Sequence, residues 1–120
     1  MSGRSADDWL GDIVLWGERL ELHLRNATWA SFFANVMLQD AVSKCVEAIG
    51  EAAGKLDDLD HALSAQFFGI QLKLARRSRD RLSHGYYHVD LAILWQTATE
   101  SVPGLVAAAR SARDVLRREP

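Results

Sequence analysis

Apolar residues recur every three or four positions along most of the chain, which is the spacing of amphipathic helices. Near the start, Ser5 is followed three residues later by Asp8, a pattern typical of a capping box at a helix N-terminus. The apolar stripe behind it consists of Trp9, Ile13, Trp16, Leu20 and Leu24. The pattern therefore predicts a first helix that begins after Ser5 and ends near Asn26.

A second, longer stripe follows a short break. Thr28 is expected to cap a short turn through Phe33, and the next helix is predicted from about Asn35 to Leu56. Its apolar positions are Leu38, Val42, Cys45, Val46, Ile49, Ala53 and Leu56. Within it Gly50 and Gly54 lie four residues apart, and therefore on one face, where the missing side chains would let another helix approach closely.

Three further helices are predicted in the second half, after an acidic connection of Asp57, Asp58 and Asp60. The third would run from about Leu63 to Leu82 and carry Phe67, Ile70 and Leu74 inward. Asp90 is expected to cap the fourth, which contains Leu91, Leu94 and Trp95 and ends near Ser101. Pro103 suits the first turn of the fifth helix, because an N–H in that turn would have no acceptor within the helix. The apolar stripe of the fifth helix is Leu105, Ala109, Ala112 and Leu116.

Composition supports this helical interpretation. The 120 residues include only 8 Gly and 2 Pro, so a sheet protein with many turns is disfavoured. We expect one domain over residues 1–120, folded as an all-α, up-down bundle of four to five helices. Cys45 is the only cysteine, which excludes an intrachain disulfide and suits a reducing cytosol. The uncharged run 26–39 is too short and polar to span a bilayer, so a cytoplasmic protein without a membrane partner is expected.

Charge is distributed unevenly. Residues 1–60 carry 5 basic and 11 acidic side chains, whereas residues 61–120 carry 9 and 5. The basic side chains gather in two groups, Arg76, Arg77, Arg79 and Arg81, and Arg110, Arg113, Arg117 and Arg118. Such groups are either the electrostatic footprint of a polyanion or solvated helix faces, and charge alone does not choose between them. As RNA contacts we predict Arg76, Arg77 and Arg81.

The string RDRLSHGY, from Arg79 to Tyr86, is the strongest candidate for chemistry. In phosphodiester cleavage His84 would move protons, and Arg79 would stabilise the charge of the five-coordinate phosphate. RNA supplies its own nucleophile through the 2′-hydroxyl, so no metal or other cofactor is needed. An unbroken helix would separate Arg79 from His84 by about 140°. Either the helix ends before His84, or two subunits share the site. The plainer alternative is that His84 ends a helix and Arg79 is solvated.

A metal site is not expected. His84 and His88 have the four-residue spacing of helical zinc pairs, but Gly85 between them should break that helix face. No cysteine or paired carboxylates near them in the sequence would complete the ligand set. His23 and His61 are expected to be ordinary surface or connector residues.

At the Arg79–Tyr86 motif the sequence resembles the HepT-like group of HEPN-type ribonuclease toxins, whose signature is Arg-x4-His-x-Tyr. Residues 39–56, QDAVSKCVEAIGEAAGKL, resemble that group's helix with its Asp-Ala-Val start and Ile-Gly-Glu-Ala centre. Residues 89–105, VDLAILWQTATESVPGL, resemble its Val-Asp, Ile-Leu-Trp and Pro-x-Leu segment. With the N-terminal helix, the resemblance covers essentially the whole chain.

The resemblance implies a homodimer that places two motifs in one basic cleft and cuts RNA. Arg79 and His84 would be catalytic, and Asp80 would occupy the supporting polar position after the arginine. A nucleotidyltransferase antitoxin would neutralise the toxin, with Tyr86 as the position modified by AMP. Two alternatives stay open. One is a catalytically inactive HEPN-like domain that binds nucleotide, RNA or a partner protein; the other is an antitoxin-like regulatory subunit.

Overall fold

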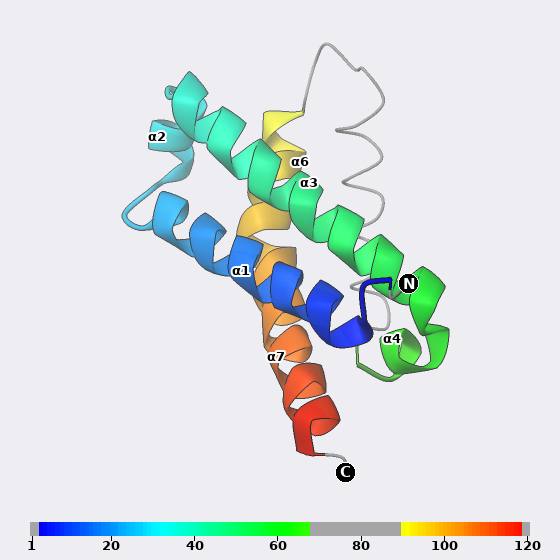
Figure 1. The fold of residues 1–120 in the computed structure, drawn as a ribbon. Coiled ribbons are helices and arrows are strands. Elements are labelled where there is room, and N and C mark those ends of the chain that lie inside the picture. The colour runs from blue at the N-terminus through cyan, green and yellow to red at the C-terminus, as the bar shows by residue number, and fades with distance from the viewer. Residues whose placement is uncertain (1–2, 68–89, 119–120) are drawn as a thin grey trace.

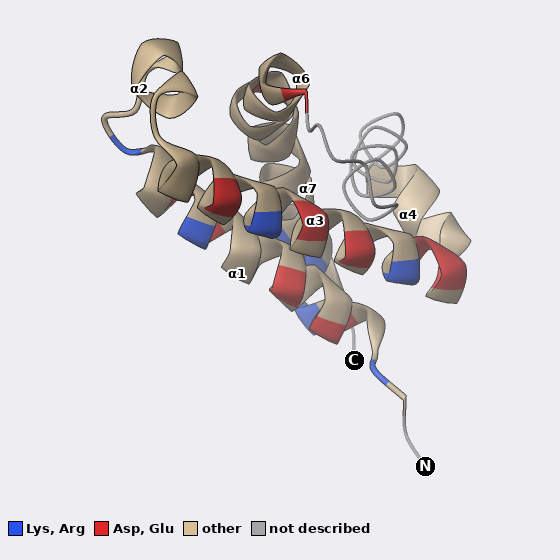
Figure 2. Ribbon diagram, turned by 90° about the horizontal axis from the view of Figure 1, so that it is seen from above, with Lys and Arg blue, Asp and Glu red and all other residues tan. Residues whose placement is uncertain are grey.

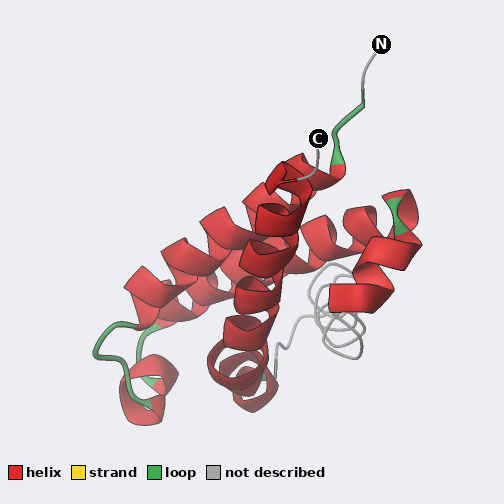
Figure 3. Ribbon diagram, turned by 90° about the horizontal axis from the view of Figure 1, so that it is seen from below, coloured by secondary structure: helices red, strands yellow, loops and turns green. Residues whose placement is uncertain are grey.

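The described part of the chain is helical. The computed structural model describes residues 3–67 and 90–118, and within these ranges it contains helices and no strand (Figures 1 and 3). The elements are α1 (Ala6–Leu24), α2 (Trp29–Phe33), α3 (Val36–Leu59), α4 (His61–Phe67), α6 (Leu91–Gln96), the π-helix η1 (Thr97–Ser101) and α7 (Val102–Arg118). The predicted all-α bundle is thereby confirmed. The predicted third helix beyond Phe67 lies outside the described residues.

Three long helical pieces build the bundle. Figure 1 shows α1 and α3 side by side and running in opposite directions, with the rod formed by α6, η1 and α7 crossing behind them. A short connection containing α2 joins α1 to α3, which favours this antiparallel pairing. Among the elements far apart in sequence that pack together are α1 and α7.

The predicted N-caps are confirmed. Ser5 Oγ accepts a hydrogen bond from the Asp8 N–H at 3.2 Å, and the Asp8 carboxylate accepts one from the Ser5 N–H at 2.9 Å. These bonds hold the pKa of Asp8 below its usual value. Thr28 caps α2 through Ser31 in the same reciprocal way. Asp90 accepts from two backbone N–H groups of the first turn of α6. Each cap satisfies donors that a helix start leaves without an internal partner.

The end of the second helix was predicted three residues too early. Asp57 and Asp58 belong to α3, which continues to Leu59 instead of stopping at an acidic connection. Only Asp60 leaves the helical conformation, with φ −148° and ψ 81°, and its carboxylate accepts from the Leu63 N–H at 3.0 Å. Asp60 therefore separates the two helices: it ends α3, and its side chain caps α4. α4 starts at His61, two residues before the predicted start.

The fourth and fifth predicted helices form one continuous rod. The backbone of Gln96, Thr97 and Val102 is helical, and the Val102 N–H donates to the Thr97 carbonyl, five residues back. Pro103 cannot donate to the Thr99 carbonyl, and in an α-turn its ring would collide with that group. The wider π-turn at η1 accommodates the proline without ending the rod. Pro103 therefore lies in the first turn of α7, as predicted, but no break precedes it.

The first apolar stripe is turned by about one residue from the prediction. Ile13 and Leu20 are buried as expected, but the other buried positions of α1 are Leu10 and Gly17. Trp9 and Trp16 are only partly buried and pack against the side of the core. The stripes predicted for α3 and α7 are buried except at one end of each, where Leu38 and Leu116 are partly buried against the core. Both Gly50 and Gly54 are buried. The buried side chains form one cluster drawn from α1, α2, α3, α6, η1 and α7.

Gly17 marks a close contact between α1 and α7. A Cβ atom built on Gly17 would overlap Val106 Cγ2, so no larger residue fits unless the Val106 side chain or one of the helices moves. A buried glycine that continues a stripe of apolar residues, between Ile13 and Leu20, is the sequence signal that indicates such a contact.

Candidate functional site

The residues predicted to carry chemistry lie outside the described part of the chain. This applies to the catalytic pair, to the supporting and modified positions, to the predicted RNA contacts and to the second histidine of the rejected zinc pair. They are Arg79 and His84, Asp80, Tyr86, Arg76, Arg77 and Arg81, and His88. Their roles stay predictions, and the described residues define the framework on either side of them.

Packed helices flank the motif-bearing segment 68–89. Before it, α4 ends at Phe67, which packs against the core, and Ser64 in the same helix is fully buried. After it, Asp90 caps α6, whose Leu94 is 4% exposed. The chain therefore enters and leaves this segment through elements that the hydrophobic core holds in place.

The second arginine group is engaged with the acidic residues of α1. Arg113 Nε and Arg117 Nε lie 3.1 and 3.2 Å from Asp7 Oδ1. Arg110 Nη2 lies 3.2 Å from Glu18 Oε1. The two guanidinium groups beside Asp7 hold the pKa of its carboxyl below the usual value. Three of the four arginines of this group are therefore paired with carboxylates of α1, which weakens the case for the group as a polyanion footprint.

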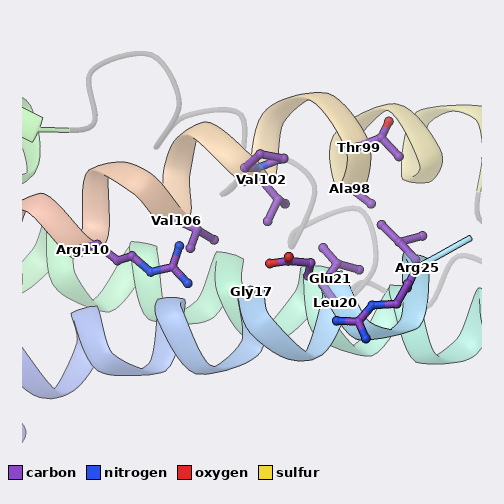
Figure 4. A pocket seen from close by; sticks show the side chains of 11 residues that line it. Gly17, Leu20, Glu21, Arg25, Ala98, Thr99, Val102, Val106 and Arg110 are labelled. Carbon is purple, nitrogen blue, oxygen red and sulfur yellow. The ribbon is translucent and has the colours of Figure 1, made fainter.

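A groove of about 580 Å³ runs along the contact between α1 and the η1–α7 rod (Figure 4). Its lining is mostly apolar and includes Gly17, Leu20, Val102 and Val106, while Glu21, Arg25 and Arg110 supply charge. The sequence patterns did not predict this groove. An open groove with an apolar floor fits side chains of a protein better than it fits a phosphodiester, which needs converging cations.

The remaining histidines and the cysteine are structural or exposed, as predicted. His23 is exposed, and His61 Nδ1 lies 2.8 Å from Asp57 Oδ1 on the surface. Within residues 3–67 and 90–118, no three His, Cys, Asp or Glu side chains are placed to hold a metal ion. Cys45 is buried in the core, and this burial raises the pKa of its thiol.

Residues 3–67 and 90–118 contain no candidate membrane-spanning helix. None of the described helices combines the length and the apolar character that crossing a bilayer requires.

Comparison with known proteins assigns the family. The family model described as "Ribonuclease HepT-like" matches residues 17–112, which include the whole Arg79–Tyr86 motif. This match covers most of the chain and spans α3, α4, α6 and most of α7. The chain belongs to the HepT-like ribonuclease family, and the resemblance found at the motif is confirmed at this level.

Individual relatives agree with the family assignment. A "Probable ribonuclease HepT" of Thermococcus cleftensis is 33% identical over 102 residues, covering 85% of this chain and 90% of that protein. Two proteins of Methanocaldococcus jannaschii named putative RNases are 29% and 28% identical, each over 103 residues. The two alignments span 83% and 86% of these proteins, and each spans 86% of this chain. No solved structure matches the chain.

Proposed function

We propose that this chain is a metal-independent endoribonuclease that acts as the toxin of a toxin–antitoxin pair. The observation that carries the proposal is the family match over residues 17–112, which includes the Arg-x4-His-x-Tyr positions. The relative of Thermococcus cleftensis named a probable ribonuclease supports the same class of activity. The fold contributes the packed elements α4 and α6 on either side of the motif-bearing segment.

In the proposed reaction the RNA supplies the nucleophile. The 2′-hydroxyl attacks the adjacent phosphorus, its proton passes to a base, and the 5′-oxygen leaves with a proton from an acid, giving a 2′,3′-cyclic phosphate. His84 carries out these proton transfers. Arg79 donates charge-assisted hydrogen bonds to the phosphate oxygens as negative charge develops on them. Asp80 supports the arginine, and Arg76, Arg77 and Arg81 bind neighbouring phosphates.

The proposal includes a homodimer. A continuous helix would turn Arg79 and His84 about 140° apart, and sharing the site between two subunits brings both to one phosphate. The proposed partners are RNA and a second copy of the chain, to which the family resemblance adds a nucleotidyltransferase antitoxin. The proposed place of the reaction is the cytoplasm.

Cleavage of RNA in the presence of EDTA tests the proposal. The purified protein is expected to cut single-stranded RNA at an undiminished rate in EDTA, to leave cyclic phosphate ends, and to scatter light as a particle of twice 13.4 kDa. The rate should fall steeply with salt, because arginines displace counterions from RNA. An inactive protein that still binds RNA, nucleotide or a protein would instead support the alternative of a catalytically silent domain. Rescue of growth on expression, rather than arrest, would indicate a regulatory subunit.

Neutralisation by AMP at Tyr86 is the second part of the proposal. An AMP group there would bring an anion within reach of Arg79, where charge-assisted hydrogen bonds would hold it in the space of an RNA phosphate. Incubation with the cognate nucleotidyltransferase, ATP and magnesium is expected to yield a Tyr86 adduct that neither binds nor cuts RNA, detected by mass spectrometry. Tyr86→Phe should stay active under the same treatment. If Tyr86→Phe is silenced and the unsubstituted protein gains no adduct, the antitoxin acts by steric occlusion.

A further inference from the structure

A second groove, between α1 and α3, combines aromatic and acidic side chains. It encloses about 290 Å³. Trp9 and Trp16 of α1 lie along it, and the carboxylates come from both helices. The charged residues of its lining are Asp12, Lys44, Glu47 and Glu51. Figure 2 shows that acidic positions continue along both α1 and α3. The groove therefore offers negative charge next to the faces of two indole rings.

The chain places one of its own arginines at the edge of this groove. The Arg4 guanidinium lies 4.1 Å from the ring centroid of Trp9, and its Nη1 donates to Asp12 Oδ2 at 2.6 Å. Arg4 precedes α1, and its side chain is 45% exposed. Stacking on an aromatic face together with a charge-assisted bond to a carboxylate is the usual way in which proteins recognise a guanidinium. Trp9 and Asp12, which line the groove, already make these two interactions with Arg4.

The second tryptophan also attracts cations. Arg19 Cζ lies 4.6 Å from the ring centroid of Trp16, and Lys44 Nζ lies 5.8 Å from it. Both distances are within the range in which the ring quadrupole attracts a cation. The two indoles lie seven residues apart on α1, two helical turns, so a bound segment would need more than one cation to contact both.

We propose that the groove between α1 and α3 binds an arginine-bearing basic segment of a partner protein, and that Arg4 holds one guanidinium position in the free chain. Charge complementarity selects this occupant, because the lining of the groove carries three carboxylates, Asp12, Glu47 and Glu51, against the single basic side chain of Lys44. The same charge repels a nucleic acid. The inference does not depend on ribonuclease activity, since its residues are separate from the proposed catalytic ones.

Fluorescence anisotropy with a dye-labelled peptide of six arginines tests the proposal on the full chain. Saturable binding is expected, with weaker binding of a six-lysine peptide, because an ammonium lacks the planar face that stacks on indole. Asp12→Asn combined with Glu47→Gln should weaken arginine binding at least about tenfold, the effect of losing two charge-assisted contacts. Arg4→Ala should strengthen it severalfold by vacating the groove. Circular dichroism confirms that each variant is folded.

Arg25→Ala is the matched control, because it removes the same charge at the far end of α1. It should leave the affinity within about twofold of the unsubstituted chain. If Arg4→Ala and Arg25→Ala strengthen peptide binding equally, the effect comes from the net charge of the chain alone, and the proposal is overturned. Unchanged binding in the Asp12/Glu47 variant would do the same. If that variant instead loses binding of a labelled DNA oligonucleotide, or loses a dimer seen by light scattering, the groove belongs to a nucleic acid or to a second copy.

Discussion

Replacing His84 by alanine is expected to lower RNA cleavage by at least about 100-fold while the helical circular dichroism spectrum and the melting temperature stay nearly unchanged. Positioned acid–base groups typically contribute between about 100-fold and 10,000-fold, and a catalytic side chain in a cleft adds little to packing. Arg79→Ala should cost about as much, because it removes the charge that stabilises the five-coordinate phosphate. Initial rates of cleavage of a labelled RNA, measured at one salt concentration in EDTA, give the comparison.

The described helices provide matched controls for both substitutions. His23→Ala removes an exposed histidine from α1, and Arg25→Ala removes an exposed arginine beyond its last turn. Both should retain full cleavage. A His84→Ala protein that unfolds, together with a folded His84→Asn protein that still cuts RNA at the original rate, would show that the histidine ends a helix and has no catalytic role.

Gly17→Ala is expected to destabilise the fold by about 1–3 kcal/mol, the typical cost of overpacking a core. Elsewhere in a helix this substitution stabilises by roughly 0.5–1 kcal/mol, because alanine has the better helix propensity. Here the added methyl group would overlap Val106 Cγ2 and force the Val106 side chain or the helices to shift. Urea unfolding followed by circular dichroism measures the free energy of unfolding, and stability equal to or above that of the unsubstituted chain would contradict the close contact.

The double variant Gly17→Ala with Val106→Ala isolates the cause. In the original structure the Val106 Cβ lies 3.4 Å from the new methyl position, an ordinary van der Waals distance, so the overlap disappears with the valine's two γ-methyl groups. The double variant should therefore be more stable than the sum of the two single effects predicts, by about 1 kcal/mol or more. If the two changes in the free energy of unfolding simply add, the destabilisation by Gly17→Ala does not arise from its contact with Val106.

The beginnings of the helices were easier to predict than their ends. Ser5, Thr28 and Asp90 cap their helices through hydrogen bonds to backbone groups two or three residues away, so the signal is contained in a few neighbouring residues. The end of α3 depends on whether Asp57 and Asp58 can stay at the surface of a helix, which no short sequence pattern decides. The π-turn before Pro103 could not be predicted, because a proline in this pattern suits the first turn of a separate helix equally well.

Burial on α1 shows the same limit. The large apolar residues Trp9 and Trp16 suggested the inward face, but the space beside α7 is so narrow that Gly17 occupies it and the indoles lie toward α3. For the candidate site, the motif from Arg79 to Tyr86 indicated the family together with residues 39–56 and 89–105, because all three are patterns of neighbouring residues. The grooves on α1 were not predictable, because they depend on how two helices meet.

The contact between Gly17 and Val106 also bears on the order in which the protein acquires its structure during synthesis. α1 and α3 can pair as soon as both have left the ribosome, but the partner of Gly17 is made 89 residues later than Gly17 itself. Until α7 arrives, the side of α1 that faces it stays open to water, and Asp7 lacks both of its arginines. The bundle therefore closes only after α7 has been made, and a nascent chain that stalls before Val102 exposes an unsealed apolar surface to proteases and chaperones.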